Sequence, residues 1–337
     1  MRLHRSSSFL LARLAIGVVL FVAVATQVDW KQVGTVIGRA SPALLGVALF
    51  IATADRVIMA AKWCFLLRRL GVPARLRDAI HSYYWGGLVG TALQWSLGGD
   101  VARGAALGRA AGATSPVAAS IVIEKLAGLA ALGCVVALSL PALEGRLGML
   151  PAGASLPLIL LGVVVVAVTP AVIAFALAPR AIAWAGRAVP RLRRTSWFPP
   201  LHTALVARPR LGRSLAAFFL FTLAEQGVAL VHLLAVAQAL ALPVGPEDVA
   251  VAAPTVLFVA RLPISVDALG VYEGMFVLLA RVMGLSNGEA LALALTDRAL
   301  GLIAIALGLA VLVPLGRLAA SGSDRLRRGG REPMHQA

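Results

Sequence analysis

Charged side chains occur inside long apolar stretches of this chain, where ordinary surface charge is not expected. Burying one charge at the centre of a bilayer costs about 2.5–3.5 kcal/mol on insertion scales, so such residues are usually paired or functional. Neighbours on a helix point about 100° apart, so neither neutralises the other and each needs a partner on another helix. An ion pair that only fixes helix packing is the alternative to a functional role. Three neighbouring pairs join opposite charges: Asp55-Arg56, Glu124-Lys125 and Asp297-Arg298.

A first glycine-rich motif, Gly98-Gly99-Asp100, lies at the end of an irregular apolar region. Glycines permit a tight turn and close backbone approach, so we expect a turn here. Arg103 follows three residues after Asp100, which places both on one helical face. A helix broken at such a point directs backbone N–H groups into the membrane interior, where they can hold an anion.

A second irregular region contains Arg261 and Pro263 before a turn that ends at Gly270, and Glu273 then opens a helix. Its negative charge suits the helix N-terminus, so capping alone is an alternative role for it. The cations of both regions suit a phosphate-bearing head group, and the acids suit an amine or proton coupling. The candidate substrate-binding residues are Asp100, Arg103, Glu124, Lys125, Arg261, Glu273, Asp297 and Arg298; the candidate hairpin backbone positions are Gly98, Gly99, Pro263 and Gly270.

The composition indicates which elements must position these residues. The 337 residues are 60% hydrophobic and only 14% charged, whereas a soluble domain averages about 25% charged residues. The sequence therefore predicts an all-α, polytopic membrane protein. The net charge of +16 would suggest nucleic acid in a soluble protein, but here it fits cytoplasmic loops, so no nucleic-acid partner is expected. Two cysteines in apolar runs and scattered histidines predict neither a metal site nor a cofactor.

About six stretches are long enough to span a bilayer, and two irregular regions, about 79–98 and 250–283, are predicted as broken or re-entrant hairpins. We expect one transmembrane domain over residues 1–320 and a disordered cytoplasmic tail over 321–337. A cleaved signal peptide over the first 25 or so residues is an alternative for the first stretch. The six stretches are 9–28, 42–67, 114–141, 155–178, 214–242 and 289–316.

Basic residues predict the topology. If both irregular regions return to their own side, 21 of the 31 Lys and Arg residues lie inside and 3 outside, as the positive-inside rule requires. This reasoning predicts that both termini are cytoplasmic.

The two halves also resemble each other. A shift of 173 positions places Asp100 on Glu273 and Glu124-Lys125 on Asp297-Arg298. Each half, about 42–141 and 215–316, contains a span, a hairpin and a span. The charge distribution puts the two hairpins on opposite sides, which predicts an inverted repeat of the kind found in transporters.

At these motifs the sequence resembles the transmembrane region of lysylphosphatidylglycerol synthases and related stand-alone flippase-like proteins. The resemblance covers about 40–316 and implies movement of a lipid or lipid-linked substrate between leaflets. The chain departs from the family pattern at Gln94-Trp95-Ser96, where a proline is common, and at Asp267-Ala268, where two glycines are common. No soluble aminoacyl-transfer domain follows the last span, so lysyl transfer is not expected. The motifs are Gly98-Gly99-Asp100-Val101-Ala102-Arg103, Glu124-Lys125-Leu126-Ala127-Gly128, Leu262-Pro263-Ile264-Ser265, Leu269-Gly270-Val271-Tyr272-Glu273-Gly274 and Asp297-Arg298.

The resemblance therefore favours a flippase or translocase of a bacterial inner membrane, for membrane lipids with an anionic or phosphate-bearing head group. The first alternative is an enzyme that acts on a lipid head group, for which His81 and Asp100 could serve, although no catalytic motif is recognisable. The second alternative is a non-transporting partner of a lipid-modifying enzyme.

Overall fold

The computed structural model describes residues 2–92, 96–148, 177, 180–195, 198–206, 211–262 and 264–329. This part is all-α, with 87% of residues helical and no strand, which confirms the predicted fold class.

Four of the described helices are long and apolar enough to cross a membrane, and they confirm four predicted spans. Large apolar side chains on them face outward, such as Phe50 (73% exposed) and Leu138 (81% exposed), as expected of a lipid-facing surface. The predicted span at 155–178 lies outside the described residues apart from residue 177. The four helices are α3 (Pro42–Arg69), α6 (Thr114–Gly148), α9 (Leu211–Ala239) and α12 (Asn287–Gly329).

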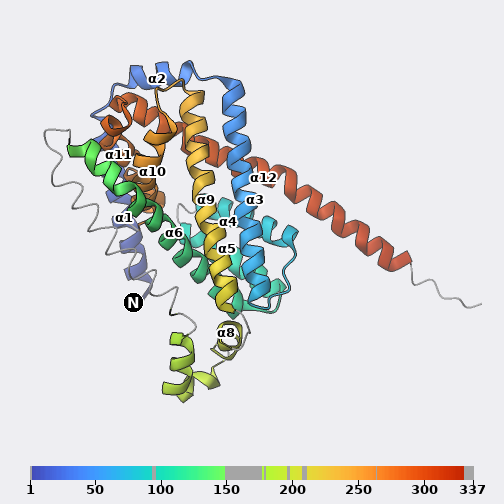
Figure 1. Ribbon diagram of the computed structural model, residues 1–337. Helices are drawn as coiled ribbons and strands as arrows, with labels where there is room; N and C mark the ends of the chain where they lie inside the picture. Colours follow the sequence, from blue (N-terminus) through green and yellow to red (C-terminus); the bar gives the residue numbers. More distant parts are fainter. Residues whose placement is uncertain are drawn as a thin grey trace, which may run out of the picture.

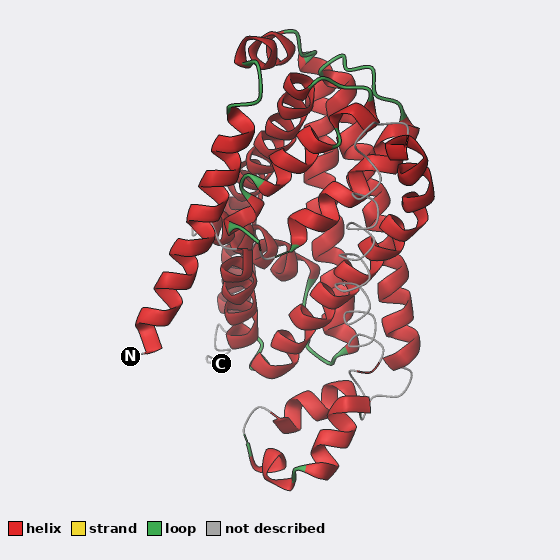
Figure 2. Ribbon diagram, turned by 90° about the vertical axis from the view of Figure 1, so that its left-hand side faces the viewer, coloured by secondary structure: helices red, strands yellow, loops and turns green. Residues whose placement is uncertain are grey.

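The first predicted span corresponds to α1 (Arg2–Ala25), which is followed by the short α2 (Trp30–Gly38). The two helices meet at 86° and together qualify as one broken span. Helix α1 runs along the outside of the other helices (Figure 2) and packs on α11 (Val271–Leu278). At the other end of the chain, α12 extends to Gly329 and so includes the first part of the predicted tail.

Helices α3 and α9 form the central pair of the fold. They pack side by side and run in opposite directions, α3 downward and α9 upward in Figure 1. Each ends in the same type of turn, with Gly71 at φ 82° and Ala241 at φ 53°. In each turn the next residue donates its N–H to a carbonyl five residues back, which satisfies one of the last carbonyls of the helix. The two bonds are Val72 N–H to Leu67 O (2.9 Å) and Leu242 N–H to Ala237 O (3.0 Å).

Both predicted irregular regions form helical hairpins. The first consists of α4 (Leu76–Ala92) and α5 (Ser96–Ala110), which pack closely on each other in the lower half of Figure 1. The second consists of α10 (Pro246–Arg261), the short η2 (Val266–Ala268), α11 and η3 (Ala280–Met283), and lies in the upper half.

The predicted turn at Gly98-Gly99 is wrong, because both residues lie inside α5. The glycines instead allow close helix contact: a Cβ on Gly86 of α4 would lie 2.7 Å from the carbonyl oxygen of Gly99. The close backbone approach expected of this motif is therefore present, but it joins two helices and does not form a turn.

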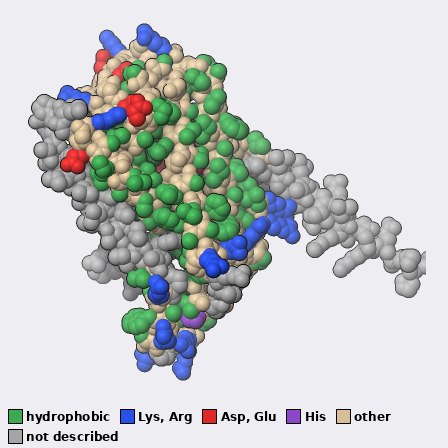
Figure 3. All heavy atoms as spheres, viewed as in Figure 1, with side chains coloured by type: hydrophobic (Ala, Val, Ile, Leu, Met, Phe, Trp, Pro, Cys, Tyr) green, Lys and Arg blue, Asp and Glu red, His purple; other side chains and the backbone are tan. Residues whose placement is uncertain are grey.

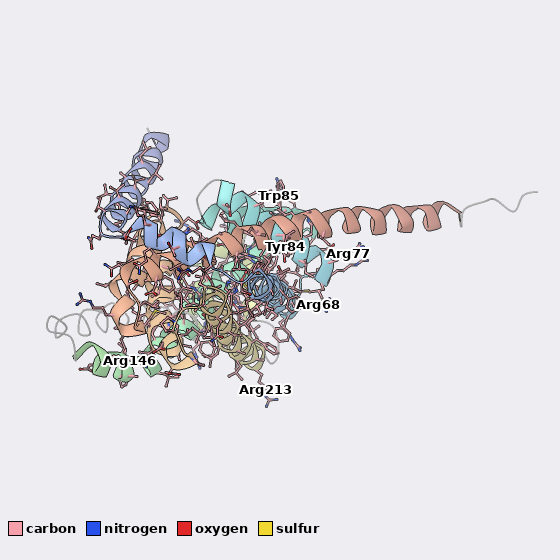
Figure 4. The ribbon with its side chains drawn as sticks, turned by 90° about the horizontal axis from the view of Figure 1, so that it is seen from above. Arg68, Arg77, Tyr84, Trp85, Arg146 and Arg213 are labelled. Atoms are coloured by element: carbon pink, nitrogen blue, oxygen red, sulfur yellow. The ribbon has the colours of Figure 1, made fainter. Side chains whose placement is uncertain are left out.

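Basic side chains gather at one end of the molecule. Figure 3 shows an apolar face with Lys and Arg side chains at both of its ends, accompanied by acidic side chains only at the upper end, so the lower end is the more basic one. Seen from above, Arg77 of α4 and Arg213 of α9 lie at the periphery (Figure 4), whereas Tyr84 lies against α12. The same end carries η1 (Pro190–Arg194), with three arginines, and α8 (Phe198–Leu205).

Candidate functional site

A cavity of about 470 Å³ lies between the two hairpins, open to the outside and lined largely by apolar atoms. The first hairpin and α6 contribute Tyr83, Glu124 and Lys125, and the second hairpin contributes Arg261 and Asp267. Helices α1, α3 and α9 add three further charges, which are Arg13, Lys62 and Glu225. Seven charged side chains from both halves of the chain therefore meet around one space, which is where concave binding sites are expected.

Arg103 is the centre of a buried ion cluster behind this cavity. Its guanidinium donates to Asp100 Oδ1 through Nε (3.0 Å) and Nη2 (2.8 Å), and Nη2 also donates to Glu124 Oε2 (2.8 Å). The guanidinium lies 4.6 Å from the ring centre of Trp63 and 4.5 Å from that of Tyr83. An arginine that is 2% exposed thus has two carboxylates and two aromatic rings as partners, which is how buried charge is tolerated.

Lys125 and Glu124 connect this cluster to the cavity. Lys125 Nζ lies 2.8 Å from Asp100 Oδ2, and the Lys125 side chain is 53% exposed. Glu124 Oε1 accepts a hydrogen bond of 2.9 Å from the Tyr83 hydroxyl. The prediction that the neighbours Glu124 and Lys125 each reach a partner on another helix is confirmed.

An analogous cluster holds the second hairpin to α12. Arg298 Nε lies 2.8 Å from Glu273 Oε1, and Arg298 Nη1 lies 3.4 Å from Asp267 Oδ2. Glu273 Oε2 also accepts the N–H of Gly270 at 2.8 Å, so this carboxylate both caps α11 and binds a cation. Asp297 accepts from the Tyr272 hydroxyl at 2.6 Å. These contacts join a hairpin to the following helix, as they do in the first half.

Arg261 has a different environment. Its Nη1 donates to the carbonyl oxygen of Gly128 (3.0 Å) and its Nη2 to Gln226 Oε1 (3.2 Å). Among the described residues no carboxylate lies within ion-pair distance of Arg261, and the residue is exposed into the cavity it lines. It is therefore a cation on the cavity wall whose charge is not neutralised by an ion pair.

The eight predicted site residues form two groups and not one. Glu124, Lys125 and Arg261 line the cavity, and Asp100 and Arg103 lie directly behind it. Glu273, Asp297 and Arg298 are in the second cluster and reach the cavity only through Asp267. Pro263 lies outside the described residues. The two residues considered for catalysis are apart, because His81 lines a separate cavity of about 280 Å³ with Asp78.

The departure from the family pattern at Asp267-Ala268 carries backbone strain. Asp267 has φ 50° and Ala268 has φ 54°, a left-handed conformation that costs most residues other than glycine about 1–2 kcal/mol. Gly270, at φ 74°, completes the turn. The predicted turn at Gly270 is thus present, and Asp267 and Ala268 adopt a positive φ that glycine would adopt without strain.

Sequence reasoning missed an ion pair across the central helices. Lys62 of α3 pairs with Glu225 of α9, and both side chains are almost fully buried. A lysine so near the end of an apolar stretch usually extends to the membrane surface, but Lys62 instead pairs with a buried carboxylate of the neighbouring helix. An acid isolated in an apolar span, such as Glu225, was the available signal. Arg13, near the start of the first apolar stretch, likewise turns toward the protein, where its Nη2 donates to the carbonyl oxygen of Ser265 at 2.7 Å.

Apolar spanning helices around a charged internal cavity define a multi-pass helical membrane protein. The family model described as "Lysylphosphatidylglycerol synthase TM region" matches residues 10–308. The chain therefore belongs to this family, as its motifs predicted. Comparisons with curated proteins and with solved structures found no match.

Proposed function

We propose that this protein moves a lipid or lipid-linked substrate with an anionic or phosphate-bearing head group between the leaflets of a bacterial inner membrane. The carrying observation is Arg261, a guanidinium on the wall of a cavity between two hairpins and without a carboxylate partner in the described part of the chain. Arginine presents a planar donor array that matches phosphate oxygens. The apolar remainder of the lining suits a head group that still carries its acyl chains.

We also propose that the halves are an inverted repeat. Three features support this: α3 and α9 run antiparallel, both end in the same hydrogen-bonded turn, and each hairpin has an acid bound to a base of the following helix. Those acid–base contacts are Asp100 to Lys125 and Glu273 to Arg298, both at 2.8 Å. In such a repeat, hairpins that enter from opposite sides open one site alternately to each leaflet.

The proposal also assigns an orientation. The basic end that contains α8, η1 and the starts of α4 and α9 faces the cytoplasm, because cytoplasmic segments accumulate Lys and Arg. Anionic membrane lipids are the expected partners of this end.

The test reconstitutes the purified protein in liposomes that contain fluorescent phosphatidylglycerol and follows its movement between leaflets with a membrane-impermeant quencher. We expect faster exchange than in protein-free liposomes. Arg261→Gln should slow exchange about 10–100-fold, because a hydrogen bond to a charged group contributes about 1.5–3 kcal/mol. Arg281→Gln is the matched control, since Arg281 is an exposed arginine of the same hairpin that does not line the cavity.

Equal rates in liposomes with and without folded protein would refute translocation of this lipid, and equal rates for the two variants would refute the role of Arg261. A chemically altered head group among the recovered lipids would support the enzyme alternative instead.

A further inference from the structure

A second group of titratable side chains lies away from the cavity, where α9 meets α3 and α12. His232 of α9 is at its centre, and its side chain is 12% exposed. Its Nε2 lies 3.0 Å from Asp297 Oδ1, and its Nδ1 lies 3.1 Å from the carbonyl oxygen of Ala48. Asp297 Oδ2 accepts from the Tyr272 hydroxyl at 2.6 Å. A single imidazole therefore connects α9 to α3 and α12, and through Asp297 to the second hairpin.

The hydrogen count of this arrangement is informative. A backbone carbonyl oxygen can only accept, so Nδ1 must carry a hydrogen to bind Ala48. The contact between Nε2 and Asp297 Oδ1 needs a second hydrogen, on either atom. A neutral imidazole and an ionised carboxylate together supply only the first. The pair is fully hydrogen-bonded only when it holds one additional, titratable proton.

We propose that His232 and Asp297 form a proton-binding site whose occupancy controls the contacts of α9 with α12 and α3. When the proton leaves, the neutral imidazole keeps one hydrogen for two acceptors. Either Nε2 and Asp297 Oδ1, 3.0 Å apart, or Nδ1 and the Ala48 carbonyl oxygen, 3.1 Å apart, then face each other with no hydrogen between them, and that contact becomes repulsive. When a proton returns, it binds to the imidazole, which is a stronger base than a carboxylate, and both bonds form again. No other bond is made or broken.

Asp55 of α3 gives the proton a neighbouring acceptor. Its Oδ1 is buried without a hydrogen-bond partner, and its carboxylate interacts electrostatically with His232. Asp55 and Lys62 are seven residues apart on α3, as Glu225 and His232 are on α9, which is about two helical turns in each case. Because α3 and α9 are antiparallel, Asp55 lies near the level of His232 and the Lys62–Glu225 pair lies two turns away.

Several other charged side chains lie near His232 and Asp55, but only Asp297 contacts the imidazole directly. Asp297 from α12 and Asp55 from α3 act on His232. The carboxylate of Asp55 interacts electrostatically with five further side chains besides His232: Arg56, Lys62, Glu225, Tyr84 and Arg261. Helices α6 and α10 also pack on α9. Their charges Glu124, Lys125 and Arg261 line the cavity, and their remaining charges lie near the end of α6 and the start of α10, where Arg146 pairs with Asp248: Glu144, Arg146, Glu247 and Asp248. Asp297 thus remains the carboxylate in direct contact with the imidazole.

The site is linked to the cavity through the second hairpin. Asp297 holds Tyr272 of α11, and its neighbour Arg298 holds Glu273 and Asp267. Asp267 lines the cavity. Loss or uptake of the proton changes the charge that faces Asp297 and is therefore transmitted to the cavity wall, so proton uptake can alternate with substrate movement. This consequence rests on the proposed function, whereas the proton site itself does not.

The direct test is nuclear magnetic resonance of protein carrying ¹⁵N-labelled histidine. The chain has five histidines, and His232→Gln assigns the relevant signal by its loss. We expect a doubly protonated imidazole at about pH 7, where an unperturbed histidine is mostly neutral. Asp297→Asn should make it neutral, because an amide N–H can donate to Nε2 and no extra proton is needed. Asp78→Asn, an acid on the first turn of α4, is the matched control and should leave the signal unchanged.

A singly protonated His232 at about pH 7 in folded protein would overturn the proposal, as would a doubly protonated signal that survives in Asp297→Asn. The liposome assay between about pH 5 and 8 tests the coupling: exchange should vary with pH in the unaltered protein and be flat in Asp297→Asn. A pH-independent rate would overturn the coupling but not the site. Absence of exchange together with the expected His232 signal would refute the proposed function alone.

Discussion

The contact between α4 and α5 provides the most direct test of how the first ion cluster is positioned. A methyl group on Gly86 would lie 2.7 Å from the Gly99 carbonyl oxygen and 3.0 Å from Cβ of Arg103. Ordinary contacts of this kind begin near 3.4 Å, so Gly86→Ala requires a displacement of about 0.7 Å between well-packed helices. The Gly99 oxygen is a backbone atom and the Arg103 Cβ is the first atom of a buried side chain, so neither can move away by a simple side-chain rotation.

The energetic consequence has two opposing parts. Overpacking costs about 1–3 kcal/mol, whereas replacing glycine by alanine inside a helix returns about 0.5–1 kcal/mol. The net expectation for Gly86→Ala is a loss of about 1–2 kcal/mol in the free energy of unfolding. The neighbouring Gly87 supplies the control, since its new methyl group would lie 3.5 Å from Ile305 Cδ1, an ordinary contact. Gly87→Ala should therefore gain about 0.5–1 kcal/mol.

Equilibrium unfolding of both purified variants in mixed detergent micelles measures this difference. The reasoning is refuted if Gly86→Ala is as stable as Gly87→Ala, because the two substitutions share chemistry, helix and environment. A stable Gly86→Ala would mean that α4 and α5 separate freely and that the glycines have no role in packing.

Three further expectations follow from the same structure. Ala241→Gly should raise the free energy of unfolding by about 1 kcal/mol, and Gly71→Ala should lower it by at least as much, because both positions have positive φ; a stabilising Gly71→Ala would contradict this. Lys62→Met should cost about 3–5 kcal/mol in unfolding experiments, and adding Glu225→Leu should restore most of it, since the single change leaves a buried charge alone. Arg103→Lys should also lower the unfolding midpoint, because an ammonium cannot reproduce the fork shared by two carboxylates; an unchanged midpoint would exclude that role.

Much of the fold is encoded locally and could be predicted. Apolar length identified four helices that the structure contains, because a spanning helix must bury its own backbone bonds whatever its neighbours are. The partners of Glu124 and Arg298 were expected on other helices for a similar reason, since an unpaired charge has no inexpensive position in lipid. Neither inference requires knowledge of the tertiary structure.

The features that sequence reasoning missed or assigned wrongly depend on which residues of other helices lie nearby in the folded protein. Lys62 and Glu225 are 163 positions apart, and nothing in either local sequence indicates the other. Gly98 and Gly99 have the composition of a turn, but α4 lies against them and makes them a packing surface. The sequence does not indicate a role for His232, which is one of several scattered histidines, because its contacts are with Asp297 and Ala48 on two other helices.

Movement of one half against the other, which the proposed function requires, is restricted by ion pairs. Within each half, the hairpin is bound to the following helix by ion pairs: Arg103 and Lys125 in the first, Arg298 in the second. Breaking such a pair leaves an uncompensated charge and costs about 3–5 kcal/mol. The halves are joined to each other by apolar side chains of α6 and α10, such as Val136 and Phe258, but also by the buried Lys62–Glu225 pair and by the pair between Arg146 and Asp248. Each hairpin should therefore stay with its following helix, and movement between the halves must either pivot about the Lys62–Glu225 and Arg146–Asp248 pairs or break them at this cost.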